Sequence, residues 1–179
     1  VELRDGDIGL FGGKSVLKAI ENVNGTINKA LAGEDVGDQE KIDEKMISLD
    51  GTENKSNLGA NAILGVSIAI CKAAAKSRRM PAYQYLGKLS QNNNFQIPQP
   101  MILMLEGGKH GNFATDIQEF MVMPKIGRFS SFIDVLAAGT KIFHCLENIL
   151  NKKGYSVGLG FEGAFCPKEI TSNEEALQL

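Results

Sequence analysis

The chain has 179 residues, of which 43% are hydrophobic and 22% charged, and this is the composition of an ordinary globular protein with one or two domains. Its net charge of −2 gives no electrostatic reason to bind nucleic acid or an anionic membrane. No apolar run approaches the ~20 residues of a membrane-spanning helix. Three widely separated cysteines without a metal-ligand pattern favour a reducing compartment such as the cytoplasm.

The first half of the chain predicts a mainly helical unit. Over 14–31, apolar residues recur every three or four positions, as on one face of an amphipathic helix. A second helix is predicted over 38–50, between an aspartate that favours helix starts and a glycine that favours helix ends. Residues 59–75 are apolar on nearly every face, which predicts a buried central helix. A short fourth helix is predicted after Pro81.

The second half predicts strands followed by helices. An asparagine-rich stretch, 87–96, is the best candidate for a linker. After it, 97–105 and 118–124 predict two strands, 130–152 a long amphipathic helix and 154–160 a third strand. This order indicates a parallel α/β layer. A closed βα-barrel needs at least ~200 residues, more than remain after the linker, so we expect only part of a barrel.

Three polar side chains lie where an α/β enzyme would carry its active site. His110 follows the first predicted strand in a glycine turn, Glu119 adjoins the apolar run of the second, and Glu162 lies in a loop of small residues after the third. A carboxylate beside an apolar strand is costly unless it is paired or used. We expect the three to converge at the carboxyl ends of neighbouring strands, where they suit proton transfer on a small polar substrate.

The same residues also have simpler interpretations. On its own, the GGKH tetrapeptide at 107–110 is most typical of a turn. Two glutamates and a histidine can equally form a structural salt-bridge cluster, which spacing alone does not distinguish from an active site. His144 falls within the long predicted helix, where a packed or hydrogen-bonded histidine is the default. The sequence carries no dinucleotide, phosphate-loop or Ser-His-Asp pattern.

Several longer motifs carry a resemblance to a known family. They are ELRDGD at 2–7, LDGTENKSNLGANAILGVS at 49–67, GGKH at 107–110, DIQEFMVMP at 116–124, and EGAFCP at 162–167 followed by SNEEAL. In this order they resemble the enolase family, the phosphopyruvate hydratases of glycolysis and gluconeogenesis. The match over 49–67 is the most specific, because it is long and nearly uninterrupted.

The resemblance implies an enolase-like α/β fold. We expect a partial, mainly helical α+β N-terminal capping domain over 1–92, followed over 93–179 by the first part of a TIM-type βα-barrel. The natural chain is expected to continue at both ends, since this one opens on Val1 and its last helix, capped by Ser172, stops after little more than one turn. The full-length protein is expected to be a cytoplasmic homodimer with no nucleic-acid or membrane partner.

The resemblance also implies an activity, that of a hydro-lyase dehydrating 2-phosphoglycerate to phosphoenolpyruvate. By motif, Glu162 matches the family's general acid, Glu119 the second glutamate near the leaving hydroxyl, and His110 the histidine that contacts substrate. The implied cofactor is Mg²⁺. Its acidic ligands and the catalytic lysines belong to a part of the family sequence beyond these matches, so we expect no metal ligand here and no activity from this chain alone.

The sequence departs from the family around these residues. The family motif GDEGGFAP reads GFEGAFCP here, so Phe161 replaces an aspartate and Ala164 a glycine. Three other residues stand where the family usually has asparagines: Leu103, Glu106 and Phe113. Because Phe161 removes hydrogen-bonding capacity beside the expected acid, we expect Glu162 to be less well oriented. The alternative to a divergent active enolase is a non-catalytic enolase-like protein or the product of a decayed gene.

Overall fold

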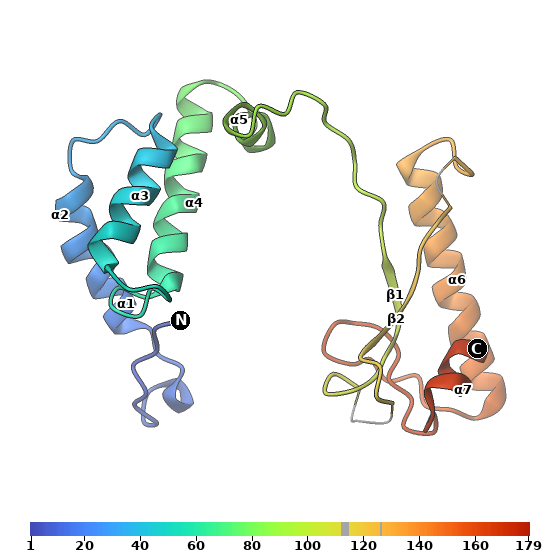
Figure 1. Cartoon of the computed structure of the whole chain (residues 1–179). Coiled ribbons are helices and arrows are strands. Elements are labelled where there is room, and N and C mark those ends of the chain that lie inside the picture. The colour runs from blue at the N-terminus through green and yellow to red at the C-terminus, as the bar shows by residue number, and fades with distance from the viewer. Residues whose placement is uncertain (112–114, 126) are drawn as a thin grey trace. The chain divides into compact units, whose positions relative to one another are not determined.

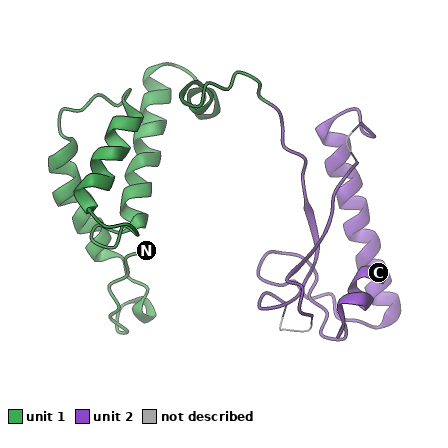
Figure 2. Ribbon diagram, viewed as in Figure 1, with its two compact units in different colours: residues 1–95 green, residues 96–179 purple. Residues whose placement is uncertain are grey.

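The computed structural model describes residues 1–111, 115–125 and 127–179. Within these ranges the chain forms two compact units, residues 1–95 and residues 96–179 (Figure 2). Each unit has its own buried apolar cluster. Phe113, one of the departures from the family, lies outside the described residues. No helix in the described part of the chain is both long enough and apolar enough to cross a membrane.

Unit 1 is built of helices, as the periodicity predicted (Figure 1). The helices are η1 Phe11–Gly13, α1 Leu17–Asn22, η2 Val23–Ile27, α2 Asn28–Leu31, α3 Gln39–Asp50, α4 Ala60–Ser77 and α5 Ala82–Leu89. The helix predicted over 14–31 is present, but a π-helical turn, η2, divides it. That turn has the sequence VNGTI, whose β-branched residues, asparagine and glycine all have low helix propensity.

The core of unit 1 lies between α3 and the neighbouring helices. Ile42 and Met46, four residues apart on α3, are almost completely buried. Helix α4 contacts α1, η2, α3 and α5, so it is the central helix of the unit. Its predicted burial on all faces is wrong, however, because Leu64 is 60% exposed and Ile68 is also exposed. No other element of unit 1 covers that face.

A loop between α3 and α4 is organised by one buried carboxylate. Asp50 accepts hydrogen bonds from the Thr52 N–H at 3.0 Å and from the Leu58 N–H at 2.6 Å, and also from the Thr52 hydroxyl. Burial alone would raise the pKa of Asp50, but these hydrogen bonds outweigh it and lower the pKa below its usual value. The charged residues of the long 49–67 motif therefore include a structural anchor for the loop.

Unit 2 is a β-hairpin packed against a long helix (Figure 1). Its elements are β1 Ile102–Glu106, β2 Glu119–Val122, α6 Phe132–Lys153 and α7 Asn173–Gln178. The core joins Met104, Leu105 and Phe120 of the hairpin to Leu146 and Leu150 of α6. The side chain of Ser172 accepts a hydrogen bond from the Glu175 N–H at 3.1 Å, which confirms the predicted cap of α7.

The predicted parallel layer is not formed by these strands. β1 and β2 pair antiparallel, with Glu106 opposite Glu119 and a bulge between Leu103 and Leu105. The connection between them carries glycine turns in its described part, instead of the helix that usually joins parallel strands. β1 also begins only at Ile102, because Pro98 and Pro100 lack the N–H groups that a paired strand needs.

The third predicted strand, 154–160, is also absent. This segment contributes a single antiparallel bridge, between Leu159 and Phe165, and Phe165 in turn makes a parallel bridge with Leu105. Two glycines, Gly158 and Gly160, weaken the segment as a strand because they add backbone entropy and no side chain to pack. The result is a loop that returns the chain to the end of β1.

Candidate active site

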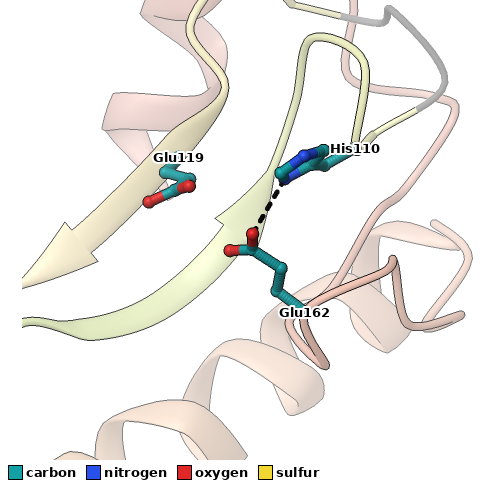
Figure 3. A group of neighbouring side chains, drawn as sticks. All are labelled: His110, Glu119 and Glu162. Carbon is teal, nitrogen blue, oxygen red and sulfur yellow. Dashed lines mark ion pairs between the residues drawn. The ribbon is translucent and has the colours of Figure 1, made fainter. Parts of the chain in front are cut away.

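His110, Glu119 and Glu162 meet at one end of the hairpin of unit 2 (Figure 3). One nitrogen or oxygen atom from each side chain lies within 4.8 Å of the others. His110 Nδ1 lies 3.1 Å from Glu162 Oε1, and the Glu162 side chain remains 42% exposed. The structure thus brings together the three side chains that the sequence singled out.

The predicted placement at the carboxyl ends of parallel strands needs correction. His110 does follow the carboxyl end of β1, but Glu119 is the first residue of β2. Because the two strands are antiparallel, the start of β2 lies at the same end of the hairpin as the finish of β1. Glu162 arrives from the loop after residue 160, which is not a strand. One end of a hairpin and a returning loop therefore build the site.

A tight turn places His110. The Gly107 N–H donates to the Gln118 carbonyl at 2.7 Å, and the His110 N–H donates back to the Gly107 carbonyl at 3.1 Å. A Cβ on Gly107 would overlap the Thr115 hydroxyl and the Ile117 carbonyl, so only glycine fits this close approach. The GGKH segment is thus a turn, as the simpler interpretation held, and the same turn presents the histidine to the two glutamates.

The loop that carries Glu162 is held by a buried carboxylate that the sequence marked only as a departure from the family. Glu106, which is 5% exposed, accepts hydrogen bonds at Oε1 from the Glu162 N–H at 3.0 Å and the Ala164 N–H at 2.8 Å. The sequence did offer one signal for the importance of Glu106, namely a charged residue at the end of an apolar strand. Its partners are backbone amides from a distant segment, which no side-chain pattern reveals.

The His110–Glu162 contact is an ion pair in distance but is not aligned as a hydrogen bond. His110 Nδ1 is buried and has no hydrogen-bond partner among the described residues, although Glu162 Oε1 is only 3.1 Å away. The imidazole is charged in this pair only when it is protonated. The arrangement leaves a buried nitrogen and a partly exposed carboxylate that a polar ligand atom or a transferred proton can satisfy.

The second histidine of the chain is not part of this site. His144 lies on α6 with its side chain mostly exposed, and its Nδ1 is 3.2 Å from Glu147 Oε2, three residues further along the same helix. It is a satisfied surface histidine, which agrees with the default interpretation of its sequence context.

Two family models match the chain. The model described as "Enolase, N-terminal domain" matches residues 1–86, and the model described as "Enolase, C-terminal TIM barrel domain" matches residues 94–179. Together they span nearly the whole chain, in the order that the motifs indicated. The chain belongs to the enolase family. Its fold is accordingly the enolase-like α/β fold, with a mainly helical N-terminal part followed by the first part of a TIM-type βα-barrel.

The departures from the usual enolase motif have different structural consequences. Phe161 is 85% exposed, and its ring meets the His110 ring edge-on with 6.3 Å between the centroids. Glu162 nevertheless lies 3.1 Å from His110 Nδ1, although the two groups are not aligned as a hydrogen bond. Ala164 is buried and its N–H is hydrogen bonded to Glu106. Burial, and then the Glu106 carboxylate, raise the pKa of the Cys166 thiol, which argues against a nucleophilic thiolate here.

The magnesium ion that enolases use does not fit the residues gathered here. His110, Glu119 and Glu162 offer one nitrogen and two carboxylate oxygens. Mg²⁺ prefers an octahedral shell of oxygen atoms, whereas an imidazole ligand is typical of transition metals. The group is therefore better described as an acid–base cluster than as the magnesium site of the family.

Proposed function

We propose that this chain supplies the acid side of the enolase reaction, the dehydration of 2-phosphoglycerate to phosphoenolpyruvate. The observation that carries the proposal is the placement of Glu162, 3.1 Å from His110 and in one group with Glu119, in a chain of the enolase family. Two carboxylates and an imidazole gathered on a partly exposed surface suit proton transfer to a leaving oxygen.

In this proposal Glu162 is the general acid. The C3–O bond of the substrate breaks, the departing hydroxide takes the proton of the Glu162 carboxyl group and leaves as water, and the electron pair at C2 forms the C2=C3 double bond. Glu119 lies beside the leaving hydroxyl and orients it. His110, whose Nδ1 lies 3.1 Å from one oxygen of Glu162, contacts the substrate beside the acid.

The other half of the reaction belongs to groups outside the matched residues. The enolase superfamily is itself a known example of a site in which a lysine or histidine base works beside Mg²⁺ that stabilises the negative charge formed at the carboxylate. We propose that the base and the Mg²⁺ ligands come from sequence beyond this chain, in a cytoplasmic homodimer. In the same proposal, residues 1–92 are the capping domain and residues 93–179 belong to the barrel.

The second candidate is a non-catalytic enolase-like protein. The observation in its favour is the altered surroundings of the acid, where an exposed phenylalanine, Phe161, replaces an aspartate and a buried glutamate, Glu106, replaces an asparagine. These changes leave the three matched side chains in place, but the first removes a polar group beside the acid and the second replaces a neutral amide with a carboxyl group.

A chimera distinguishes the two candidates. Residues 94–179 of this chain would replace the matching segment of an active enolase, and phosphoenolpyruvate formation would be followed by its ultraviolet absorbance with Mg²⁺ present. Turnover above that of a preparation lacking substrate supports the enzyme. A chimera that folds and binds 2-phosphoglycerate but does not turn over supports the non-catalytic candidate. Sequencing the coding DNA on both sides then tests whether the family's acidic ligands and lysines follow.

A further inference from the structure

We propose that Glu106 is a positioning residue, which holds the loop carrying Glu162 against the turn carrying His110. The inference rests on the proposed function for its catalytic meaning, but its structural content stands on the contacts of Glu106 alone. Glu106 is the last residue of β1 and is almost completely buried, next to Leu105 of the apolar cluster and close to the buried Thr115.

Glu106 touches all three segments that carry the site. Its Oε1 accepts from the N–H groups of Glu162 and Ala164, and its own N–H donates to the Phe165 carbonyl at 2.9 Å. Glu119 lies directly opposite it in the hairpin. The turn that presents His110 starts at the next residue along the chain. A single residue thus joins the returning loop, the second strand and the histidine turn.

The energetics argue that stability alone does not account for this glutamate. Its second oxygen, Oε2, is buried and has no hydrogen-bond partner among the described residues. An unpaired oxygen of a buried carboxylate costs free energy, and Glu119 places a like charge directly across the hairpin. Against these costs, a carboxylate makes charge-assisted hydrogen bonds that are stronger than those of a neutral amide. In return for these costs, the hydrogen bonds of Glu106 fix the position of the loop that carries Glu162.

The loop is shaped to admit the carboxylate. A Cβ on Gly160 would overlap Oε2 and the carboxyl carbon of Glu106, whereas a Cβ on Gly158 would meet nothing within 4 Å. The chain therefore offers two glycines on one loop, of which only Gly160 makes room for Glu106. This difference provides a test that leaves every charged side chain in place.

The first test compares Glu106→Gln with Glu169→Gln in the whole chain. Glu169 is a matched control, because it also accepts from a backbone N–H and a hydroxyl, both of Ser156, at 3.0 and 2.9 Å. Amide hydrogen exchange is measured at residues 162 and 164. We expect exchange there to accelerate severalfold in Glu106→Gln, and about tenfold in Glu106→Ala, which loses the acceptor outright. Glu169→Gln should leave both amides unchanged.

The second readout is the ¹⁵N resonance of the His110 ring. Release of the Glu162 loop removes the carboxylate beside Nδ1, so this resonance should move in Glu106→Gln and in Gly160→Ala. It should stay in place in Gly158→Ala. His144, paired with Glu147 on α6, is the internal reference and should not move in any variant. A purely structural role for Glu106 would change thermal stability without changing the His110 resonance selectively.

The two measurements together decide whether Glu106 positions the loop. Unchanged exchange at 162 and 164 together with an unmoved His110 resonance in Glu106→Gln and Gly160→Ala overturns the proposal, as does an equal response in the two control variants. If Glu106→Gln does not fold, amide exchange at residues 162 and 164 in Gly160→Ala decides, since this variant retains the carboxylate and displaces it. The His110 resonance of Gly160→Ala is not used for that decision, because the new Cβ would also lie 3.0 Å from the His110 carbonyl oxygen. None of these measurements uses turnover, so failure of the proposed enolase activity would leave the positioning result intact, and the reverse also holds.

Discussion

At the scale of single residues, the site combines a constrained histidine with an accessible glutamate. His110 Nδ1 is buried, while the Glu162 carboxylate next to it remains open to solvent on one side. In the proposed role of general acid, Glu162 needs this open side, because the substrate must come within hydrogen-bond distance of the carboxyl group. The exposed ring of Phe161 meets the His110 ring edge-on, and the Glu162 side chain beside it keeps 42% of its surface exposed.

The proposed role of Glu162 as general acid predicts a specific kinetic change. In an active enolase chimera that carries this segment, Glu162→Gln should lower kcat by ~10²–10⁴, because general acid catalysis contributes a factor of that size, and should change KM little. Glu147→Gln is the control, since Glu147 also pairs with a histidine but lies on α6. Steady-state phosphoenolpyruvate formation measures both constants. A loss expressed mainly in KM would instead identify Glu162 as a binding residue.

Residue-scale features of the site were only partly predictable. His110, Glu119 and Glu162 stood out because polar groups next to apolar strands on glycine loops are unusual, and the structure gathers them. The hydrogen bonds of Glu106 were not predictable, since backbone N–H groups are present at almost every residue and leave no mark in the sequence. The contact between the rings of Phe161 and His110 depends on how the 160–164 loop folds back, which spacing does not determine.

At the scale of elements, periodicity predicted the helices, and the apolar runs predicted two of the three strands: β2 lies within 118–124 and β1 overlaps the end of 97–105. The predicted helices over 38–50 and 130–152 are present within one or two residues, because apolar spacing and end residues agree. The strand predicted over 154–160 is absent because glycines weaken that segment as a strand. The strand predicted over 97–105 begins only at Ile102, because the prolines up to Pro100 cannot donate backbone hydrogen bonds. Antiparallel pairing of β1 and β2 was missed because an apolar run alone does not encode strand direction.

One element-scale contact predicts a dependence of stability on pH. Glu34, in the segment between α2 and α3, accepts from Lys41 Nζ at 2.7 Å and Lys45 Nζ at 2.6 Å on α3. These two hydrogen bonds lower the pKa of Glu34 from 4.5 to about 2. A carboxyl group whose pKa is lowered by folding stabilises the folded state above its unfolded pKa. That stabilisation is therefore present above pH 4.5 and is lost as the pH falls toward 2.

The measurement is urea unfolding of the wild type and of Glu34→Gln between pH 7 and pH 2. We expect the variant to be less stable at pH 7, with a difference that shrinks below pH 4.5 and with added salt, because the lysines are exposed. Glu53→Gln, at an exposed loop position, is the control and should follow the wild type. A stability difference that stays constant from pH 7 to pH 2 would exclude the ion pairs as its cause.

At the scale of the whole molecule, each unit buries a core yet leaves apolar surface open. On unit 2, a hollow of about 540 Å³ is lined by both strands, α6 and α7, and most of its lining is apolar. On unit 1, the exposed face of α4 is likewise apolar. Contiguous apolar surfaces of this kind drive association in water, because burying them removes their contact with solvent.

Self-association of the 179-residue chain is therefore expected. Its sedimentation coefficient should rise with protein concentration, and Ile142→Glu should reduce that rise by placing a charge in the hollow on unit 2. Ile133→Glu is the control, since Ile133 is a more exposed residue of α6 that does not line the hollow. A wild-type chain that sediments as a monomer at all concentrations would contradict the expectation.

The 179-residue chain alone is not expected to turn over 2-phosphoglycerate. The residues gathered in its site are two carboxylates and an imidazole, and the lysine base and magnesium ligands of the enolases match none of its motifs. Without a base, the weakly acidic C2 proton of 2-phosphoglycerate is not removed, and without the metal the resulting dianion is not stabilised. Purified chain with Mg²⁺ and 2-phosphoglycerate should thus show no increase in phosphoenolpyruvate absorbance over a heat-denatured control.

Contaminating host enolase is the main source of a false signal. A Glu162→Gln chain purified in parallel is the control for it, because contaminating activity would be equal in the two preparations. Turnover that is present in the wild type and absent in that variant would place a complete catalytic machinery within these 179 residues and would refute the division of labour argued above.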